Sequence, residues 1–453
     1  MLSMSLVRAG ALGLALALVP GISQAETLRE ALERAYANNP NIMSALLSVK
    51  ASAEDIALRK AGKLPQISMT GTLGGNFAVT EGTASVGHSY RLSLSYQQNL
   101  FDNFQTEAQI EQARAFSEVS KYALRNEEQH VLLAVATAYM TVVRDTQLVE
   151  LRAANVEFFQ AQVDSSESRL RLGEGTQIDV SQASTRLAAA VASYRAAIAS
   201  LQTSQASYER WVGRKPRDLV RDYSFNGSLP ASIDAAIASA EANHPAILIA
   251  RASIRAAQAG SDAARAAFGP TLNLIGSLCG IGCFAGDPGQ GGVTGSVGLS
   301  LSIPIYSGGA MGASVRKANL LQIKSEVDAL AARDQVKESV IAAWSSMQNA
   351  AAQIESAESA VSSGRLVVEG TVQERDVGQR TTLDVLNAQA ELTAAREGLI
   401  SASSSRVIAS FALLAASGRL SATDLGLRVE VKSADGYIAT VEDVWQELRA
   451  IDD

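Results

Sequence analysis

The pattern Gly-x-x-Thr-x-x-Asp occurs twice in the sequence, at Gly173–Asp179 and again at Gly378–Asp384. A threonine three residues before a carboxylate is the capping pattern in which both side chains bond free backbone N–H groups at the start of a helix. The preceding glycine suits the left-handed residue that ends the helix before it. The spacing therefore predicts two helix–turn–helix tips, with Asp179 and Asp384 as carboxylates and with capping residues Gly173, Thr176, Gly378 and Thr381.

The remaining polar residues show no pattern that indicates catalysis. The three histidines, His88, His130 and His244, lie far apart and have neither metal-binding nor catalytic spacing. The sequence contains no Gly-x-Ser-x-Gly elbow and no phosphate-binding loop. We therefore expect a protein that is not an enzyme, with no catalytic residue, no metal site and no cofactor.

The two cysteines, Cys279 and Cys283, fall in a glycine-rich segment that we expect to be a loop after the third strand. If the chain is exported, they enter an oxidising compartment. This context predicts a small disulfide between them, with free thiols as the alternative. No further ligands accompany the pair, so the spacing does not indicate a zinc site.

The overall charge restricts the classes of partner. The chain has 453 residues, 46 acidic and 39 basic, and a net charge of −7. Nucleic-acid binding needs a basic surface, so we expect no nucleic-acid partner. Charged residues make up only 19% of the chain and aromatic residues 5%, as in long packed helices or in sheets that line water.

The N-terminal residues have the features of an export signal. Arg8 precedes an apolar run of 11 residues, Ala9–Val19, and small residues follow up to Ala25. This pattern predicts a signal peptide over residues 1–25 and a mature chain that starts at Glu26; an ordinary N-terminal helix is the alternative. No later stretch has about 18 consecutive apolar residues. We therefore expect no transmembrane helix, and a chain that is periplasmic, secreted or a β-barrel.

An internal repeat divides the chain. A shift of 205 positions aligns residues 28–213 with residues 233–418 without a net gap, which indicates a first repeat over 26–213 and a second over 232–418. The aligned pairs include Pro40 with Pro245, Pro65 with Pro270, Gly71 with Gly276, Tyr139 with Trp344, and Gly213 with Gly418. We therefore expect two duplicated units, a linker at 214–231 and a C-terminal segment at 419–453.

Each unit should contain very long helices. Glycine is absent from Gln105 to Leu172, a run of 68 residues, and proline is absent from residue 66 to residue 215. The composition is rich in Ala, Gln, Glu, Arg and Leu, which favour helix. A helix of this length would reach roughly 100 Å. The pattern therefore predicts coiled-coil-like rods.

Each unit also contains two segments in which apolar and polar residues alternate. They are Gln66–Leu73 and Tyr90–Gln97 in the first half, and Thr271–Leu278 and Ser296–Ile305 in the second. Period-two alternation predicts strands with one apolar face, and a soluble packed sheet is the alternative. Polar positions that are small and nearly uncharged, together with aromatic residues near segment ends, favour a membrane barrel.

Four strands cannot close a membrane barrel by themselves. An open sheet edge in lipid leaves backbone groups unpaired, at a cost of several kcal/mol each. Bacterial barrels begin at about eight strands. The chain is therefore expected to self-associate, and three protomers would supply twelve strands and room for a pore.

Residues Val377–Ala388, with the weaker match Leu172–Ala183, resemble the tip motifs of the TolC family of outer-membrane export channels. The resemblance covers residues 26–425. It implies an α+β membrane protein: a homotrimer with a twelve-stranded outer-membrane β-barrel, four strands per chain. A long α-helical tunnel continues the barrel into the periplasm. It also implies that the linker and the C-terminal segment form an equatorial belt around the tunnel.

The family resemblance assigns roles to the tips. In the family an arginine on an inner helix latches to a carboxylate on a neighbouring turn, and axial aspartates form an acidic ring. The matching positions are Arg380 for the latch, Asp179 for its partner and Asp384 for the ring. The family's second axial aspartate falls on Asn387, and its latch tyrosine on Arg375. These departures imply a weaker charge ring and a latch that uses Arg375 as well as Arg380.

The resemblance also implies a function and partners. It implies the outer-membrane channel of a tripartite export system, a passive exit for proteins in type I secretion or for small toxic molecules in efflux. The implied partners are a periplasmic adaptor, an inner-membrane ABC or RND-type pump, and outer-membrane lipid. The alternative is a trimeric coiled-coil adhesin or structural surface protein, although a duplication with strands in both halves argues against it.

Overall fold

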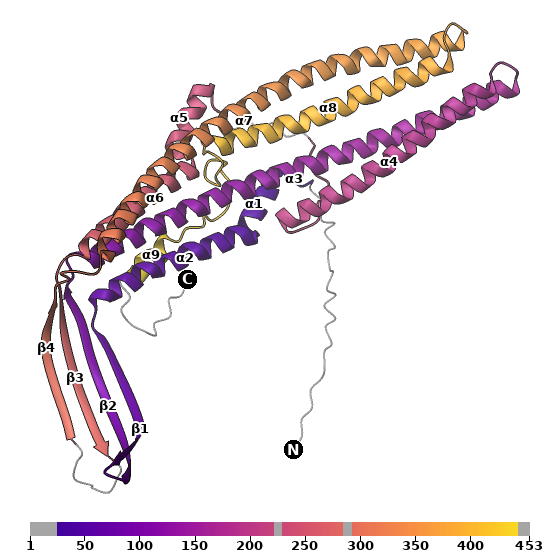
Figure 1. Ribbon diagram of the computed structural model, residues 1–453. Helices are drawn as coiled ribbons and strands as arrows, with labels where there is room; N and C mark the ends of the chain where they lie inside the picture. Colours follow the sequence, from indigo (N-terminus) through magenta and orange to yellow (C-terminus); the bar gives the residue numbers. More distant parts are fainter. Residues whose placement is uncertain (1–24, 222–228, 284–291, 443–453) are drawn as a thin grey trace, which may run out of the picture.

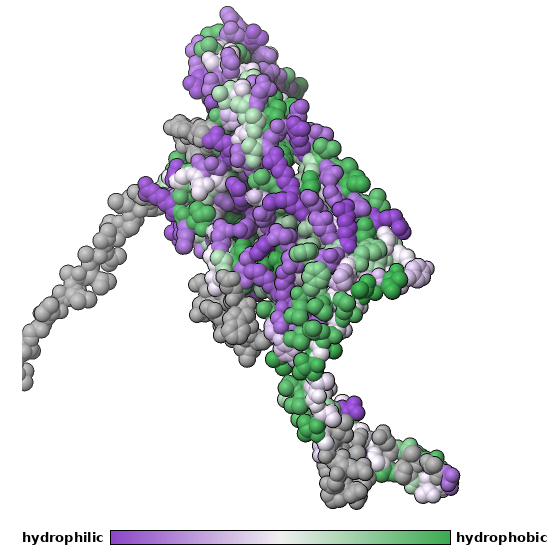
Figure 2. Space-filling view, turned by 90° about the vertical axis from the view of Figure 1, so that its left-hand side faces the viewer, coloured by the Kyte–Doolittle hydropathy of each residue, from purple (hydrophilic) through white to green (hydrophobic). Residues whose placement is uncertain are grey.

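A computed structural model describes residues 25–221, 229–283 and 292–442 of the chain. The predicted signal peptide therefore lies, apart from Ala25, outside the described residues. The chain is long and narrow, with four strands at one end and paired helices extending away from them (Figure 1). Hydrophobic residues gather over the strands, whereas hydrophilic residues cover much of the helical part on the face in Figure 2.

Four helices form the long part of the molecule. Helix α3 spans Gln105–Arg171 and α7 spans Ala310–Asp376, each 67 residues long. Each turns back at its far end into a shorter helix, α4 (Gln177–Val212) or α8 (Thr382–Ala416). At 1.5 Å per residue the two long helices extend about 100 Å. This confirms the long helices predicted from the glycine-free runs.

The shorter helices repeat the same order in both halves. Helices α1 (Leu28–Asn38) and α2 (Pro40–Lys60) precede the first strand pair. Helices α5 (Ile233–Asn243) and α6 (Pro245–Ala266) precede the second. A 3₁₀ turn, η1 (Ala61–Lys63), follows α2, and a last helix, α9, spans Asp435–Glu442. Near the strands, α2 packs on α3, and α6 packs on both α3 and α7.

The strands form one antiparallel sheet in the order β1-β2-β3-β4. Their bounds are Gln66–Thr80, Thr83–Phe101, Thr271–Cys283 and Gly292–Ser302. Directly paired residues include Ile67 with Tyr96, Tyr96 with Gly276, and Gly276 with Val297. Because paired residues share a face, the predicted apolar positions of all four strands lie on one side of the sheet.

The first hairpin is longer than its sequence pattern predicts. The alternating pattern predicts strands only over Gln66–Leu73 and Tyr90–Gln97, yet β1 and β2 continue through the glycine-rich residues between them. Glu81 and Gly82 alone make the turn, and their φ angles are 52° and 82°. Two positive φ values in a two-residue loop match the strand twist. Pairing across the hairpin thus overrides the weak strand preference of glycine.

The two cysteines lie in a strand, so their loop assignment needs correction, and this extended backbone does not suit the predicted disulfide. Strand β3 continues through Cys283, and Cys279 is a free thiol within it. Four residues of extended strand separate the two Cα atoms by about 13 Å, whereas a disulfide needs less than about 7 Å. Cys279 pairs with Ser93 and Thr294 in the sheet, so it lies on the polar face.

Tight turns join the strands to the long helices. Asn103 and Phe104, between β2 and α3, have φ angles of 55° and 66°. The corresponding residues before α7, Gly308 and Gly309, have φ angles of 62° and 84°. The same left-handed pair therefore redirects the chain in both repeats. Asp102 stabilises the first turn, since its Oδ2 accepts a 2.9 Å hydrogen bond from the Thr106 N–H.

The main core lies midway along the helices, where the predicted mature start is buried. Glu26 is only 2% exposed, and its carboxylate pairs with Arg214 Nη2 at 2.6 Å. Its carbonyl accepts hydrogen bonds from the Tyr139 hydroxyl at 2.7 Å and from the Val220 N–H at 3.1 Å. The first residues of the linker are therefore fastened to α3 and to Glu26, the predicted start of the mature chain.

The C-terminal segment crosses the same region. Glu442 of α9 pairs with Lys60 at 3.2 Å and with Arg114 at 3.3 Å, and Asp435 pairs with Lys121 at 2.6 Å. These ion pairs hold α9 against α2 and α3. The described parts of the linker and of the C-terminal segment thus lie around the middle of the helical body.

Among the described helices, α8 is apolar and long enough to suit a membrane span by length and composition alone. No apolar stretch of this length was expected from the sequence. Half of its apolar window is buried inside the fold, and the helix packs along α7 and α3. Its apolar character therefore reflects helix packing.

A stripe of exposed apolar residues runs along α7. Leu320, Ile323, Val327 and Leu330 are between 55% and 66% exposed and follow each other at intervals of three and four residues. This is the a/d spacing of a coiled-coil seam. No other described strand pairs with the outer side of β1 or of β4. Both features predict association with further copies of the chain.

We therefore expect Ile323→Asp to disrupt assembly. Burying an aliphatic side chain stabilises by about 1.5–3 kcal/mol, and a carboxylate at the seam would lose this term and add a desolvation cost. The measurement is the oligomeric state in detergent, by size exclusion and by heat-modifiable gel migration.

Lys324→Ala is the matched control, since Lys324 makes only an exposed ion pair with Asp328 on α7. An Ile323→Asp protein that assembles as the control does would show that the seam is not an interface.

Candidate gate at the helical tip

The two turns at the far end of the helices are built alike. In the first, Thr176 Oγ1 accepts a 3.2 Å hydrogen bond from the Asp179 N–H, and Asp179 Oδ2 accepts one of 2.9 Å from the Thr176 N–H. In the second, Thr381 and Asp384 make the same pair of bonds at 3.2 and 2.9 Å. Each turn is thus a complete capping box.

Glycine completes each turn. Gly173 and Gly378 have φ angles of 80° and 79°, a left-handed conformation that costs little only without a side chain. Hydrogen bonds from the Thr176 hydroxyl and backbone lower the pKa of Asp179, and those from the Thr381 backbone and hydroxyl lower the pKa of Asp384. Both carboxylates therefore stay ionised at neutral pH, and both turns are locally fixed.

Arg380 bonds within its own hairpin in the described chain. Its Nε donates to Glu374 Oε2 at 2.9 Å, and both side chains are about half exposed. The Glu374 carboxylate also raises the pKa of Arg380. Asp179, meanwhile, bonds to Thr176. A single protomer thus does not bring Arg380 and Asp179 together, although the family's latch acts on a neighbouring turn.

Arg375 crosses between the two hairpins. It is only 9% exposed, and its Nη1 donates to Gln162 Oε1 of α3 at 2.6 Å. Its Nε and Nη2 both donate to Asp376 Oδ1, at 3.1 and 2.8 Å. The arginine that replaces the family tyrosine therefore ties α7 to α3. The sequence did not indicate Gln162 as a site residue, because it belongs to no motif.

Asn387 makes a second bond between the hairpins. Its Oδ1 accepts a 2.9 Å hydrogen bond from Arg186 Nη2 of α4. Asn387 follows Asp384 by three residues, so the two lie on one face of α8, one turn apart. Asn387 is uncharged where the family resemblance implies a carboxylate, and the guanidinium of Arg186 brings a positive charge to this place. The sequence alone did not indicate Arg186.

Further contacts join α3 to α8 away from the tip. Arg152 donates to both oxygens of Glu397, at 2.7 and 3.2 Å. Asn155 Oδ1 accepts from the Thr393 hydroxyl at 3.0 Å. A small apolar cluster lies among these contacts, formed by Phe159, Val163, Ala183, Ala190 and Leu386. Between the main core, which also joins α3 to α8, and the tip, the two hairpins therefore meet through a few polar bonds and one short apolar contact.

The end of the molecule also presents apolar side chains. Leu172, Ile178 and Val377 are 74%, 67% and 72% exposed. Beside them lies an open groove of about 480 Å³, lined by Gln177, Ile178, Ser181, Gln182, Thr185, Arg186 and Leu383. Exposed apolar groups beside a groove suit contact with another protein.

Comparison with known proteins identifies the family. The model of the outer membrane efflux protein family matches residues 31–214 and 236–419, one match in each repeat. The outer membrane efflux protein BepC of Brucella suis biovar 1 (strain 1330) is 36% identical over 433 residues, which cover 94% of this chain and 93% of BepC. The outer membrane protein TolC of Escherichia coli (strain K12) is 24% identical and covers 91% and 86%.

Solved structures show the same fold. The Campylobacter jejuni CmeC outer membrane channel matches with a TM-score of 0.78, 15% identity, and coverage of 92% of this chain and 89% of CmeC. CusC matches with a TM-score of 0.75, 20% identity, and coverage of 86% and 92%. These likenesses support the barrel and tunnel architecture.

The family match thus confirms the resemblance to TolC, as well as the outer-membrane location and export function that it implied. The family consists of channels that work as trimers in tripartite systems. The chain belongs to the outer membrane efflux protein family and is an outer-membrane export channel subunit, with four strands for a trimeric twelve-stranded barrel and a helical tunnel that continues it into the periplasm.

Proposed function

We propose that this channel is a passive conduit, closed at its periplasmic tip by polar contacts between hairpins and opened by its partners. The observation that carries the proposal is the Arg375–Gln162 hydrogen bond, which joins α7 to α3 next to the turn. The capping boxes keep each turn intact. Opening can then move one hairpin relative to the other without unfolding either.

The energies of these contacts suit a gate. A hydrogen bond that includes a charged group contributes about 1.5–3 kcal/mol, and exposed pairs contribute less. Breaking Arg375–Gln162 and Arg186–Asn387 therefore costs a few kcal/mol at most. The Arg152–Glu397 pair lies further from the turn and would remain as the hinge side, whereas the small apolar cluster lies level with Gln162 and Asn387 and would loosen with them.

The proposed gate has a second latch, which acts between protomers. Arg380 would exchange its partner Glu374 for Asp179 on a neighbouring turn, as the family resemblance implies. Asp179 keeps a charge because of its lowered pKa, and Arg380 is exposed enough to reach outward. Partner binding would shift the population from the latched to the open state.

The proposed partners are a periplasmic adaptor and an inner-membrane pump of the ABC or RND type. The adaptor would contact the groove beside Ile178 and Leu383, where exposed apolar residues surround the turns. Three further relatives are an alkaline protease secretion protein, a fusaric acid resistance protein and the outer membrane protein of a toluene efflux pump. Both cargo classes thus occur among relatives.

The cargo can be assigned by deletion of the gene. BepC, at 36% identity, is named as an efflux protein, so we expect the deletion strain to become more sensitive to small toxic molecules. Growth under a drug and bile-salt panel and the secreted proteome are measured together. Loss of secreted proteins alone would assign type I secretion, and no change in either would contradict an export role.

We expect Arg375→Ala to raise the single-channel conductance in planar bilayers, because α7 would lose its bond to α3 near the turn. Gln162→Ala should have a similar effect, and the double variant should add little to either. Arg171→Ala is the control, since Arg171 bonds only to Ser168 on its own helix. Equal conductance in the wild type and both single variants would remove this bond from the gate.

The latch between protomers makes a separate prediction. Arg380→Ser and Asp179→Ala should each raise conductance, because each removes one side of the pair. Glu374→Gln should leave conductance unchanged or lower it, since it frees Arg380 for Asp179. If Glu374→Gln instead opened the channel while Asp179→Ala did not, Arg380 would act within its own hairpin only.

A further inference from the structure

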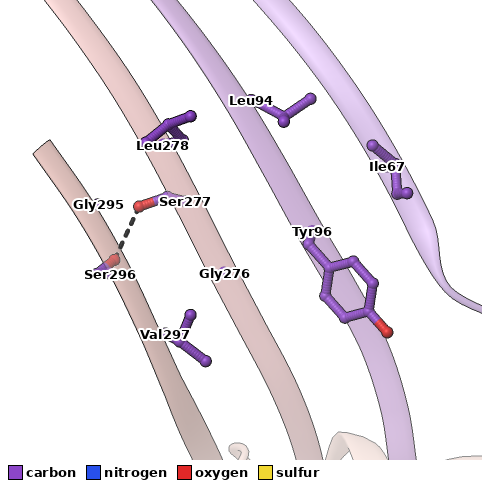
Figure 3. A pocket seen from close by; sticks show the side chains of 9 residues that line it. All are labelled: Ile67, Leu94, Tyr96, Gly276, Ser277, Leu278, Gly295, Ser296 and Val297. Carbon is purple, nitrogen blue, oxygen red and sulfur yellow. Dashed lines mark hydrogen bonds between the residues drawn. The ribbon is translucent and has the colours of Figure 1, made fainter. Parts of the chain in front are cut away.

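The apolar face of the sheet is hollowed at one place. The hollow has a volume of about 410 Å³ and lies across all four strands (Figure 3). Two glycines, Gly276 and Gly295, form its floor. The apolar side chains around it are Ile67, Leu94, Tyr96, Leu278 and Val297.

The backbone does not require glycine at either position. Both residues lie within regular strands, and neither has a positive φ. A Cβ on Gly276 would lie 3.5 Å from Tyr96 Cβ, and one on Gly295 would lie 3.4 Å from Leu278 Cδ1, which is ordinary contact. Glycine in a strand costs about 0.5–1 kcal/mol relative to alanine. The missing side chains therefore leave space that the fold could have filled.

The ring of Tyr96 is held away from this space. An aromatic residue opposite a strand glycine commonly covers it, and Tyr96 pairs directly with Gly276. Its hydroxyl instead donates to Gln98 Oε1 at 2.7 Å, and Gln98 Nε2 donates to the Lys63 carbonyl at 3.4 Å. Figure 3 shows the ring leaning away from Gly276. The Tyr96–Gln98 bond therefore keeps the hollow open.

The surroundings select an apolar occupant. The side chains of Ser277 and Ser296 bond each other at 2.8 Å on the polar face, so they do not offer polar groups to the hollow. No charged residue lines it. The hollow is continuous with the apolar face of an outer-membrane barrel, which contacts lipid. Ile67 is the second residue of β1, so the hollow lies near the periplasmic boundary.

We propose that the hollow binds one acyl chain of a phospholipid, whose head group lies at the level of Gln98 and Lys63. Each protomer would hold one such chain. The first repeat has no second copy of the site, because Tyr90 stands at the position that corresponds to Gly295. Gly71 corresponds to Gly276 and supplies a matched control on the same face.

The test is the amount of phospholipid that stays bound to the trimer after detergent exchange, counted by native mass spectrometry with phosphatidylethanolamine as the probe. Wild type and Gly71→Leu should keep about one phospholipid per protomer. Gly295→Leu, which fills the hollow, should lower this at least fivefold. Equal retention in all three proteins, or none in the wild type, would overturn the proposal.

A second variant acts without filling the hollow. Gln98→Leu removes the acceptor for the Tyr96 hydroxyl, so the ring should swing over Gly276 and reduce phospholipid retention. Single-channel conductance shows whether each variant assembles into a channel. If Gly295→Leu does not assemble, phospholipid retention by the Gln98→Leu channel is the test of the proposal. Unchanged retention in an assembled Gln98→Leu channel, or retention of lipopolysaccharide in place of phospholipid, would overturn the assignment.

Discussion

The structure depends on the pairing of backbone groups at the edges of one sheet. Among the residues that the structure describes, β1 and β4 each pair along one side only, and lipid offers no hydrogen bonds to the other side. Closure by neighbouring chains therefore sets the oligomer. Each strand is joined to a helix at one of its ends by a short connection, so the closed barrel also fixes how many helices enter the tunnel and where they stand. The exposed seam on α7 agrees with this, because a lone protomer leaves it in water.

Two kinds of interaction stabilise the tip of the helices, one within each hairpin and one between the hairpins. The capping boxes join residues three apart, so each turn keeps its shape whatever the neighbouring helices do. The bonds from Arg375 and Arg186 join separate hairpins and are few. Each hairpin is therefore rigid in itself, whereas the contacts between the hairpins are weak. A gate needs both properties, since it must move without unfolding.

The charge at the tip differs from what the family resemblance implies. Asn387 stands where the resemblance implies a second carboxylate, and the Arg186 guanidinium bonds to it one helical turn from Asp384. Two unpaired carboxylates so close would repel each other. The arginine and the amide avoid that repulsion and add a bond between α4 and α8. Arg375 similarly replaces one hydrogen-bonding hydroxyl with a guanidinium that binds two partners.

The sequence by itself determined the local elements. The glycine-free run predicted α3, and the internal repeat extended that prediction to α7. Alternation predicted the strands, and the Gly-x-x-Thr-x-x-Asp spacing predicted both turns, because these signals depend on residues within a turn or a strand of each other. It did not predict the full length of β1 and β2 or the free Cys279, which pairing with adjacent strands decided. Nor did it predict Gln162 with Arg375 or Arg186 with Asn387, which lie 213 and 201 residues apart. Such contacts depend on the rotation of each helix, and a shift of one residue turns a side chain by about 100°, so only the packed structure decides which side chains meet.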